Sequence, residues 1–147
     1  EKAKAIYNAA LKHSRREGND DMDPFIKGKI ANMYSEIGDA YRSAGFLRSA
    51  IEEYQRALQL RPLYVDIRTK LAATFRDLGD LDNAIGELTR VLRDRSQYVP
   101  ALNLMGVCQY MLGEADKAID YWNQVLAIDA DNSVSAMYIK MVRSDIS

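Results

Sequence analysis

The chain carries few side chains of the types that perform catalysis or bind metal ions. Its one histidine is His13, between Lys12 and Ser14, and its one cysteine is Cys108. An imidazole acts as a general base, and a thiolate as a nucleophile, only beside a suitable partner group, and a metal site needs several ligands together. We interpret His13 as a cation near a helix C-terminus, where it interacts favourably with the helix dipole, and Cys108 as a small packing residue.

The carboxylates and glycines offer no catalytic site either. Two acidic pairs, Glu52 with Glu53 and Asp20 with Asp21, are expected on a solvated helix face and in a turn, whereas acid–base catalysis would want paired carboxylates in an apolar pocket. The glycines are spaced as helix ends and helix crossings, and not as a phosphate-binding loop. The sequence therefore predicts no catalytic residue, no cofactor and no metal site, so we expect a protein that is not an enzyme.

The charge balance limits the partners. Charged residues make up 28% of the 147 residues but leave a formal net charge of -1, which argues against binding nucleic acid through its phosphates. The longest uncharged run, 96–113, has about the length of a membrane span. It contains Pro100, Asn103 and Gln109, and we expect a buried helix there and no insertion into a membrane. A lone cysteine excludes an internal disulfide, and the free thiol favours a cytoplasmic location. Whether a targeting segment precedes Glu1 is a question that the sequence leaves open.

The elements that position these residues repeat along the chain. Gly45 recurs as Gly79 and Gly113, each time after 34 residues, and three further sets keep the same interval. These sets are Ala50, Ala84 and Ala118; Ile51, Ile85 and Ile119; and Leu58, Leu92 and Leu126. A fixed period of this length indicates a stacked array of helical hairpins. Each glycine is expected to end the first helix of its hairpin.

The segment from Ala31 to Pro62 resembles the tetratricopeptide repeat (TPR). The residues that carry the resemblance are Tyr34, Ile37, Gly38, Tyr41, Ala50, Tyr54, Ala57 and Pro62. The pattern weakens in later repeats, where Arg68 and Gln109 stand at positions that usually hold an aromatic residue, and we expect weaker packing there. The resemblance implies an all-α fold, a right-handed superhelical α-solenoid of TPR hairpins.

We predict a single TPR domain over residues 1–147. An N-terminal helix and turn occupy 1–22, either as half a repeat or as an unrelated cap. A first repeat with an extended first helix, capped by Asp23 and begun by Pro24, occupies 23–64. The second and third repeats occupy 65–98 and 99–132, and a C-terminal capping helix occupies 133–147.

The resemblance also implies a site. In this family, partners lie in a concave groove that first helices line at fixed offsets. Carried over to this chain, the predicted groove residues are Asn32, Ser35, Asp39, Arg42, Thr69, Arg76, Asn103, Val107, Tyr110, Met111, Met137 and Met141. Met and Tyr suit adaptable contacts with a partner, although further repeats or a folded-back tail are an equal explanation for their apolar patch. Arg42 and Arg76 either bind an acidic group of a partner or pair with Asp39 and Asp77.

One subtype of the family is not predicted. TPR domains that hold the C-terminal carboxylate of a chaperone use Lys and Asn in the first repeat, Asn in the second, and Lys and Arg in the third. The matching positions hold Ser35, Asp39, Lys70, Pro100 and Leu104. None carries the required residue.

We therefore expect a scaffold or adaptor that binds a peptide or helix of another protein in its groove. Two alternatives stay open at this point. The chain is otherwise a regulatory or substrate-recruiting segment of a larger enzyme, or a scaffold that assembles with itself by stacking.

Overall fold

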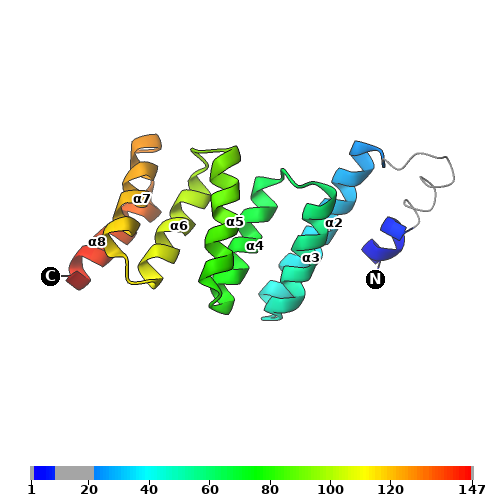
Figure 1. Ribbon diagram of the computed structural model, residues 1–147, viewed down its shortest axis with the longest axis horizontal. Coiled ribbons are helices and arrows are strands. Elements are labelled where there is room, and N and C mark those ends of the chain that lie inside the picture. Colours follow the sequence, from blue (N-terminus) through cyan, green and yellow to red (C-terminus); the bar gives the residue numbers. More distant parts are fainter. Residues whose placement is uncertain (1, 9–21, 147) are drawn as a thin grey trace. The chain divides into compact units, whose positions relative to one another are not determined.

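The computed structural model describes residues 2–8 and 22–146, and all the regular secondary structure among them is helical (Figure 1). A helical segment covers 2–8. The remaining helices are α2 (Pro24–Ser43), α3 (Leu47–Leu60), α4 (Val65–Leu78), α5 (Leu81–Asp94), α6 (Val99–Met111), α7 (Ala115–Ile128) and α8 (Ser133–Ile146). This order confirms the expected all-α fold.

The chain forms two compact units, Glu1–Ile67 and Arg68–Ser147. The first contains segment 2–8, α2, α3 and the start of α4, and the second contains the rest of α4 and the helices that follow. The helix pairs α2 with α3, α4 with α5, and α6 with α7 fall within the ranges expected for three repeats. The division of 1–147 into one domain with those repeat boundaries stays a prediction.

The same glycine turn closes the first helix of every pair. Gly45, Gly79 and Gly113 have φ values of 85°, 87° and 84°, a left-handed conformation that glycine adopts without a Cβ clash. In each turn the residue after the glycine donates its N–H to a carbonyl five residues back, as Phe46 does to Tyr41 at 2.9 Å. This is the Schellman arrangement, and the predicted helix ends are confirmed.

Within two of the pairs the helices cross closely at a glycine. A Cβ added to Gly38 would lie 2.7 Å from Cε1 of Tyr54, and one added to Gly106 would lie 2.6 Å from Cε2 of Trp122. The rings are nearly inaccessible to solvent, so these crossings leave no room for a side chain. The sequence predicted small residues at the approach of α2 to α3, and the structure adds that the opposing group is an aromatic ring.

Helix α2 is longer than its counterparts because its start is capped early. Asp23 accepts a hydrogen bond from the backbone N–H of Phe25 at 2.7 Å, and Pro24 occupies the first turn. The resulting helix has 20 residues, whereas α6 has 13. Both the cap and the extension confirm the sequence prediction.

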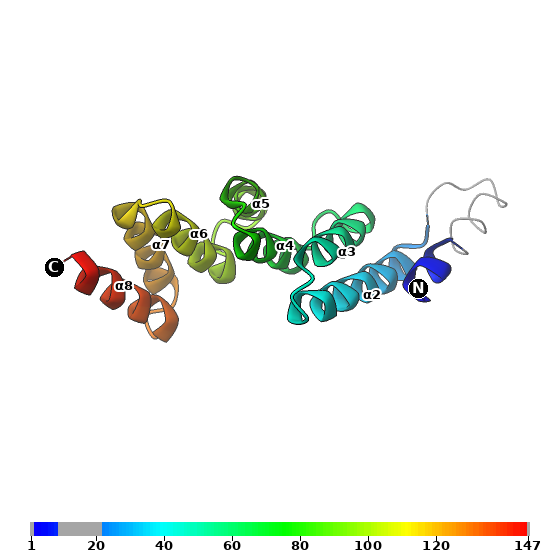
Figure 2. The ribbon, with the colours of Figure 1, turned by 90° about the horizontal axis from the view of Figure 1, so that it is seen from below.

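Segment 2–8 packs beside α2 in the first unit (Figure 2). Ala3 is fully buried, and the ring of Tyr7 meets the ring of Tyr34 edge-on, with the centroids 6.2 Å apart. Ala3 is thus buried like Ala50 of the next hairpin, and whether this segment is half a repeat or an unrelated cap stays a prediction. His13, Asp20 and Asp21 lie outside the described residues.

One prediction about the acidic residues is wrong. Glu52 is exposed, but Glu53 is buried, with 3% of its surface accessible. Arg56, one turn further along α3, donates a hydrogen bond to Glu53 at 2.5 Å. The expectation of a solvated face failed because it was based on composition, whereas the period of α3 places Glu53 beside the apolar stripe.

Candidate functional site

The predicted groove residues of the second unit include an exposed apolar surface on α6 and α8. We call it the methionine face: Val107, Tyr110, Met111, Val134, Met137 and Met141. The residues on each helix are three or four apart and so share one side of it. Val107 is half-buried against a core cluster that includes Ile139 and Val142 of α8, which places this side of α6 beside α8.

The exposed members of this face are large apolar side chains that water reaches. Tyr110 is 39% exposed, Met111 49%, Met137 50% and Met141 55%. An isolated exposed apolar side chain is ordinary, but a contiguous group of them marks a surface for binding. Four of the predicted residues are thus exposed on α6 and α8, and the predicted Val107 is half-buried beside them; their role in binding stays a prediction.

A hydrogen bond ties the two helices together at the edge of the methionine face. The Tyr110 hydroxyl donates to Oδ2 of Asp145 at 2.8 Å. This bond and the charge of the carboxylate raise the pKa of Tyr110. Sequence reasoning missed Asp145, although it follows Met111 by one repeat length of 34 residues, and carrying that offset into α8 would have found it.

Asn103 serves the packing of the second unit. Its carbonyl oxygen accepts a hydrogen bond from Nε1 of Trp122 at 3.1 Å, and its side-chain oxygen accepts one from the hydroxyl of Ser135. Trp122 and Ser135 are both buried. Asn103 therefore links α6 to α7 and α8, and replacing it would disturb the support of the methionine face.

On α4 the predicted residues are Thr69 and Arg76, and both are partly exposed. Arg76 is paired with the adjacent Asp77, with Nη2 and Oδ1 2.9 Å apart. The arginine thus makes the neighbouring ion pair that the sequence offered as one alternative. It adds a neutralised charge pair to the surface of the second unit.

In the first unit the predicted residues lie on α2, where Asn32 is exposed and Ser35 is buried. Asp39 accepts a hydrogen bond from the hydroxyl of Tyr54 at 2.5 Å. Burial raises the pKa of Tyr54 well above its ordinary value, and the hydrogen bond and charge of Asp39 raise it further; the nearby Arg42 acts in the opposite direction. Asp39 is therefore engaged inside the hairpin.

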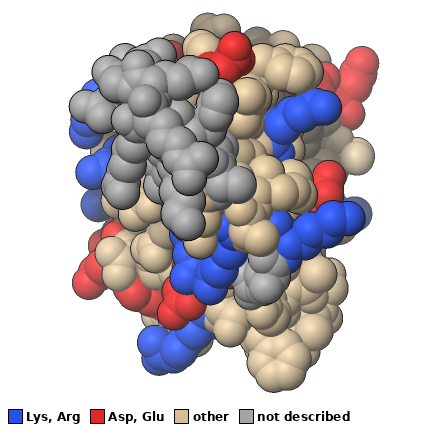
Figure 3. Space-filling view, turned by 90° about the vertical axis from the view of Figure 1, so that its right-hand side faces the viewer, with Lys and Arg blue, Asp and Glu red and all other residues tan. Residues whose placement is uncertain are grey.

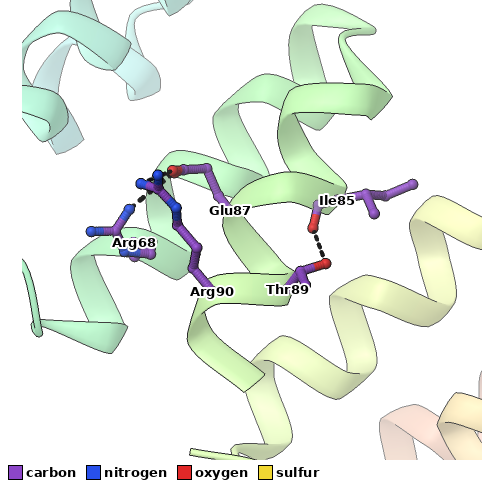
Figure 4. A network of polar contacts seen from close by, with 5 residues as sticks. All are labelled: Arg68, Ile85, Glu87, Thr89 and Arg90. Atoms are coloured by element: carbon purple, nitrogen blue, oxygen red, sulfur yellow. Dashed lines mark hydrogen bonds and ion pairs between the residues drawn. The ribbon is translucent and has the colours of Figure 1, made fainter. Parts of the chain in front are cut away.

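A polar network occupies the position in the second hairpin where an aromatic residue was expected (Figure 4). Arg68 is nearly buried, and its Nη1 donates to both carboxylate oxygens of Glu87, at 3.0 and 3.1 Å. Arg90, which is largely exposed, approaches the same carboxylate at 3.8 Å. Sequence reasoning noticed Arg68 as a departure from the pattern but missed Glu87, its compensating charge.

The described part of the chain holds neither an exposed, reactive thiol nor a cluster of side chains that could bind a metal ion. Cys108 is buried, and burial raises the pKa of its thiol, which favours the inert protonated form. No group of three or more His, Cys, Asp or Glu side chains within 2–8 and 22–146 is placed to hold a metal ion. No helix in the same ranges has the length and apolar character needed to cross a bilayer.

Charges of both signs share the surface. On the face drawn in Figure 3, acidic side chains interrupt the basic ones. A surface that binds nucleic acid through its phosphates needs a continuous basic area, and this face does not present one.

Two sequence profiles of one family match the chain. The profile described as TPR repeat matches residues 38–75, and the one described as Tetratricopeptide repeat matches residues 75–138. Together with the glycine turns and the helix pairs, they identify an all-α helical-repeat protein. The chain belongs to the tetratricopeptide repeat family. No curated protein sequence matches it significantly.

Solved structures share this fold. The first TPR of Spaghetti (RPAP3), bound to the HSP90 peptide SRMEEVD, has a TM-score of 0.75 at 18% identity, covering 81% of this chain and 94% of that one. The second TPR domain of human RPAP3, in complex with the HSP70 peptide SGPTIEEVD, has a TM-score of 0.72 at 16% identity, covering 82% and 98%. MamA has a TM-score of 0.68 at 25% identity, covering 79% and 63%.

Proposed function

We propose that the chain is a non-enzymatic protein-interaction module that binds a peptide or helix of a partner protein on the methionine face. The observation that carries this proposal is the exposure of Tyr110, Met111, Met137 and Met141 on adjoining sides of α6 and α8. Burying such side chains against a partner is favourable by about 25 cal/mol per Å² of apolar area. Two structurally similar TPR domains bind chaperone peptides, which supports a binding role.

The chemistry of the face suggests the character of the partner segment. Its centre is apolar and adaptable because methionine has several rotatable bonds and a polarisable sulfur. At its edge the Tyr110–Asp145 pair offers a polar contact. A partner segment with apolar anchors at intervals of three or four residues would fit it best.

The test is a charge placed within the face, with a matched charge outside it. Met141→Glu should abolish capture of the partner by the immobilised chain, because a carboxylate would be buried against apolar groups. Ile128→Glu provides the control, since Ile128 is comparably exposed, at 42%, but lies at the end of α7. Circular dichroism should show the same helical content for both variants. Equal loss of capture in the two variants, or retention in both, would overturn the proposal.

A further inference from the structure

A second surface of the second unit is distinct from the methionine face. Between α7 and α8 lies an open cleft of about 560 Å³, lined by Asn123, Leu126, Ala136, Ile139, Lys140, Arg143 and Ser144. We call it the end cleft. On α8, residues 136, 140 and 143 share one side, residues 134, 137 and 141 share another, and the buried Ile139 and Val142 lie between them.

The repeat identifies what kind of element fits the end cleft. One repeat length before Ala136 and Lys140 are Leu102 and Gly106. That side of α6 receives the second helix of its own hairpin, and Gly106 lies against Trp122 of α7. By the same register, the side of α8 that lines the end cleft is the side on which a further helix would pack.

The residues of α8 alter that side in a specific way. Lys140 stands where α6 has the crossing glycine, and Arg143 stands where it has Gln109. A helix docked here cannot approach as closely as α7 approaches α6, because the lysine side chain must be accommodated. Both cations are exposed, and neither has an ion-pair partner among the described residues.

We propose that the end cleft binds an amphipathic helix of a partner protein whose polar edge is acidic. The apolar side of that helix covers Leu126, Ala136 and Ile139. Its carboxylates pair with Lys140 and Arg143, which line the cleft together with these apolar residues. The helix occupies the place of the second helix in a fourth hairpin.

Charge distinguishes this partner from a second copy of the chain. In a head-to-tail stack, the helical segment 2–8 of another copy would be the complementary half hairpin. That segment carries Lys2 and Lys4 and no carboxylate. Docking it would bring two further positive charges close to Lys140 and Arg143, and like charges at close range oppose association.

The experiment uses the full chain and two synthetic helical peptides of about 18 residues, a length above the limit for isolated helices. One peptide carries leucines along one side and glutamates flanking them, and the other carries lysines in place of the glutamates. Fluorescence anisotropy should show the acidic peptide binding at least about tenfold more tightly than the basic one, and the difference should shrink between about 0.05 and 0.5 M salt. An acidic peptide without the leucines should bind no better than the basic peptide.

Charge reversal locates the binding. The double variant with Lys140→Glu and Arg143→Glu should bind the acidic peptide at least about tenfold more weakly, because attraction at two sites becomes repulsion. Arg93→Glu with Lys117→Glu is the control, since both residues are exposed on α5 and α7, outside the cleft, and the net charge changes equally.

Three outcomes would overturn the proposal. The first is equal binding of the acidic and basic peptides or no binding of the acidic one. The second is an equal effect of the two double variants. The third is self-association of the chain, seen by light scattering, that the Lys140→Glu and Arg143→Glu changes abolish, because a second copy would then be the occupant.

Loss of the methionine face through Met141→Glu should leave peptide binding in the cleft intact, so this proposal and the proposed function fail separately.

Discussion

The absence of a side chain at Gly106 is a packing requirement. The space that a Cβ would fill is occupied by the indole ring of Trp122, which is 1% exposed and donates its Nε1–H to the carbonyl of Asn103. The ring is fixed by both its burial and its hydrogen bond, so it has little freedom to move aside. A rigid neighbour makes even one added methyl group costly.

Replacing Gly106 with alanine should therefore destabilise the protein, although alanine is the better helix former. We expect a loss of about 1–3 kcal/mol in the free energy of unfolding, which is the usual cost of overpacking. The measurement is urea denaturation followed by the fluorescence of Trp122, the one tryptophan of the chain.

Gly86 supplies the matched control. It lies within α5, is exposed, and has no neighbouring atom within 4 Å of the position of an added Cβ. Gly86→Ala should stabilise the protein by up to about 1 kcal/mol, because glycine loses more conformational freedom on folding. A Gly106→Ala variant as stable as the wild type would show that α6 and α7 do not cross as described.

At the scale of the helix pair, an ion pair replaces an apolar anchor in the second hairpin. Arg68 holds the position that Tyr34 and Leu102 hold in the neighbouring repeats, and it is nearly buried against Glu87. Desolvating two charges offsets most of their attraction. The pair therefore adds little stability in itself, but each member is needed once the other is present.

Removal of Glu87 alone should be damaging. We expect Glu87→Ala to lower the free energy of unfolding by about 2 kcal/mol, because Arg68 would remain desolvated without its carboxylate. The double variant with Arg68→Leu and Glu87→Ala should recover most of that loss, since no charge is then buried. Thermal unfolding followed by circular dichroism measures both variants, and together with Arg68→Leu they complete a double-mutant cycle.

Arg90→Ala tests whether the third member of the network matters. Arg90 is 61% exposed in its side chain and lies 3.8 Å from the carboxylate. Exposed pairs of this kind contribute about 0–1 kcal/mol to the free energy of unfolding, so Arg90→Ala should lower it by no more than that. A loss on removing Arg90 as large as the loss on removing Glu87 would contradict the assignment of Arg68 as the principal partner.

At the scale of the whole molecule, the sequence predicted the fold well because the fold is periodic. Glycine turns, buried alanines and apolar stripes recur every 34 residues, so each repeat supports the assignment of the next. The sequence reading failed where charged side chains pair within a hairpin. Glu53 and Glu87 stand one repeat length apart, but only the structure shows that Glu53 lies against Arg56 and Glu87 against Arg68. The end cleft was missed for a related reason, since it is formed by side chains of two helices.

The side-chain donors that this chain lacks predict which peptides it does not bind. A clamp for a C-terminal carboxylate requires Lys, Asn and Arg side chains at five positions, and this chain has Ser35, Asp39, Lys70, Pro100 and Leu104 there. Asp39 is itself an acceptor and already receives the hydroxyl of Tyr54. Lys70 alone supplies a cation, and one charged donor cannot replace the set.

The chain should therefore not bind the peptide SRMEEVD, which the first TPR of Spaghetti binds. Each lost charge-assisted hydrogen bond weakens binding by about 1.5–3 kcal/mol, so the absence of several amounts to about a thousandfold or more. Isothermal titration calorimetry of the peptide into this chain should give no saturable heat, with the Spaghetti domain as the positive control. Saturable binding would mean that donors at other positions recognise the carboxylate. Binding that persists when the peptide's C-terminus is amidated would instead indicate that its side chains, and not its terminal carboxylate, are recognised.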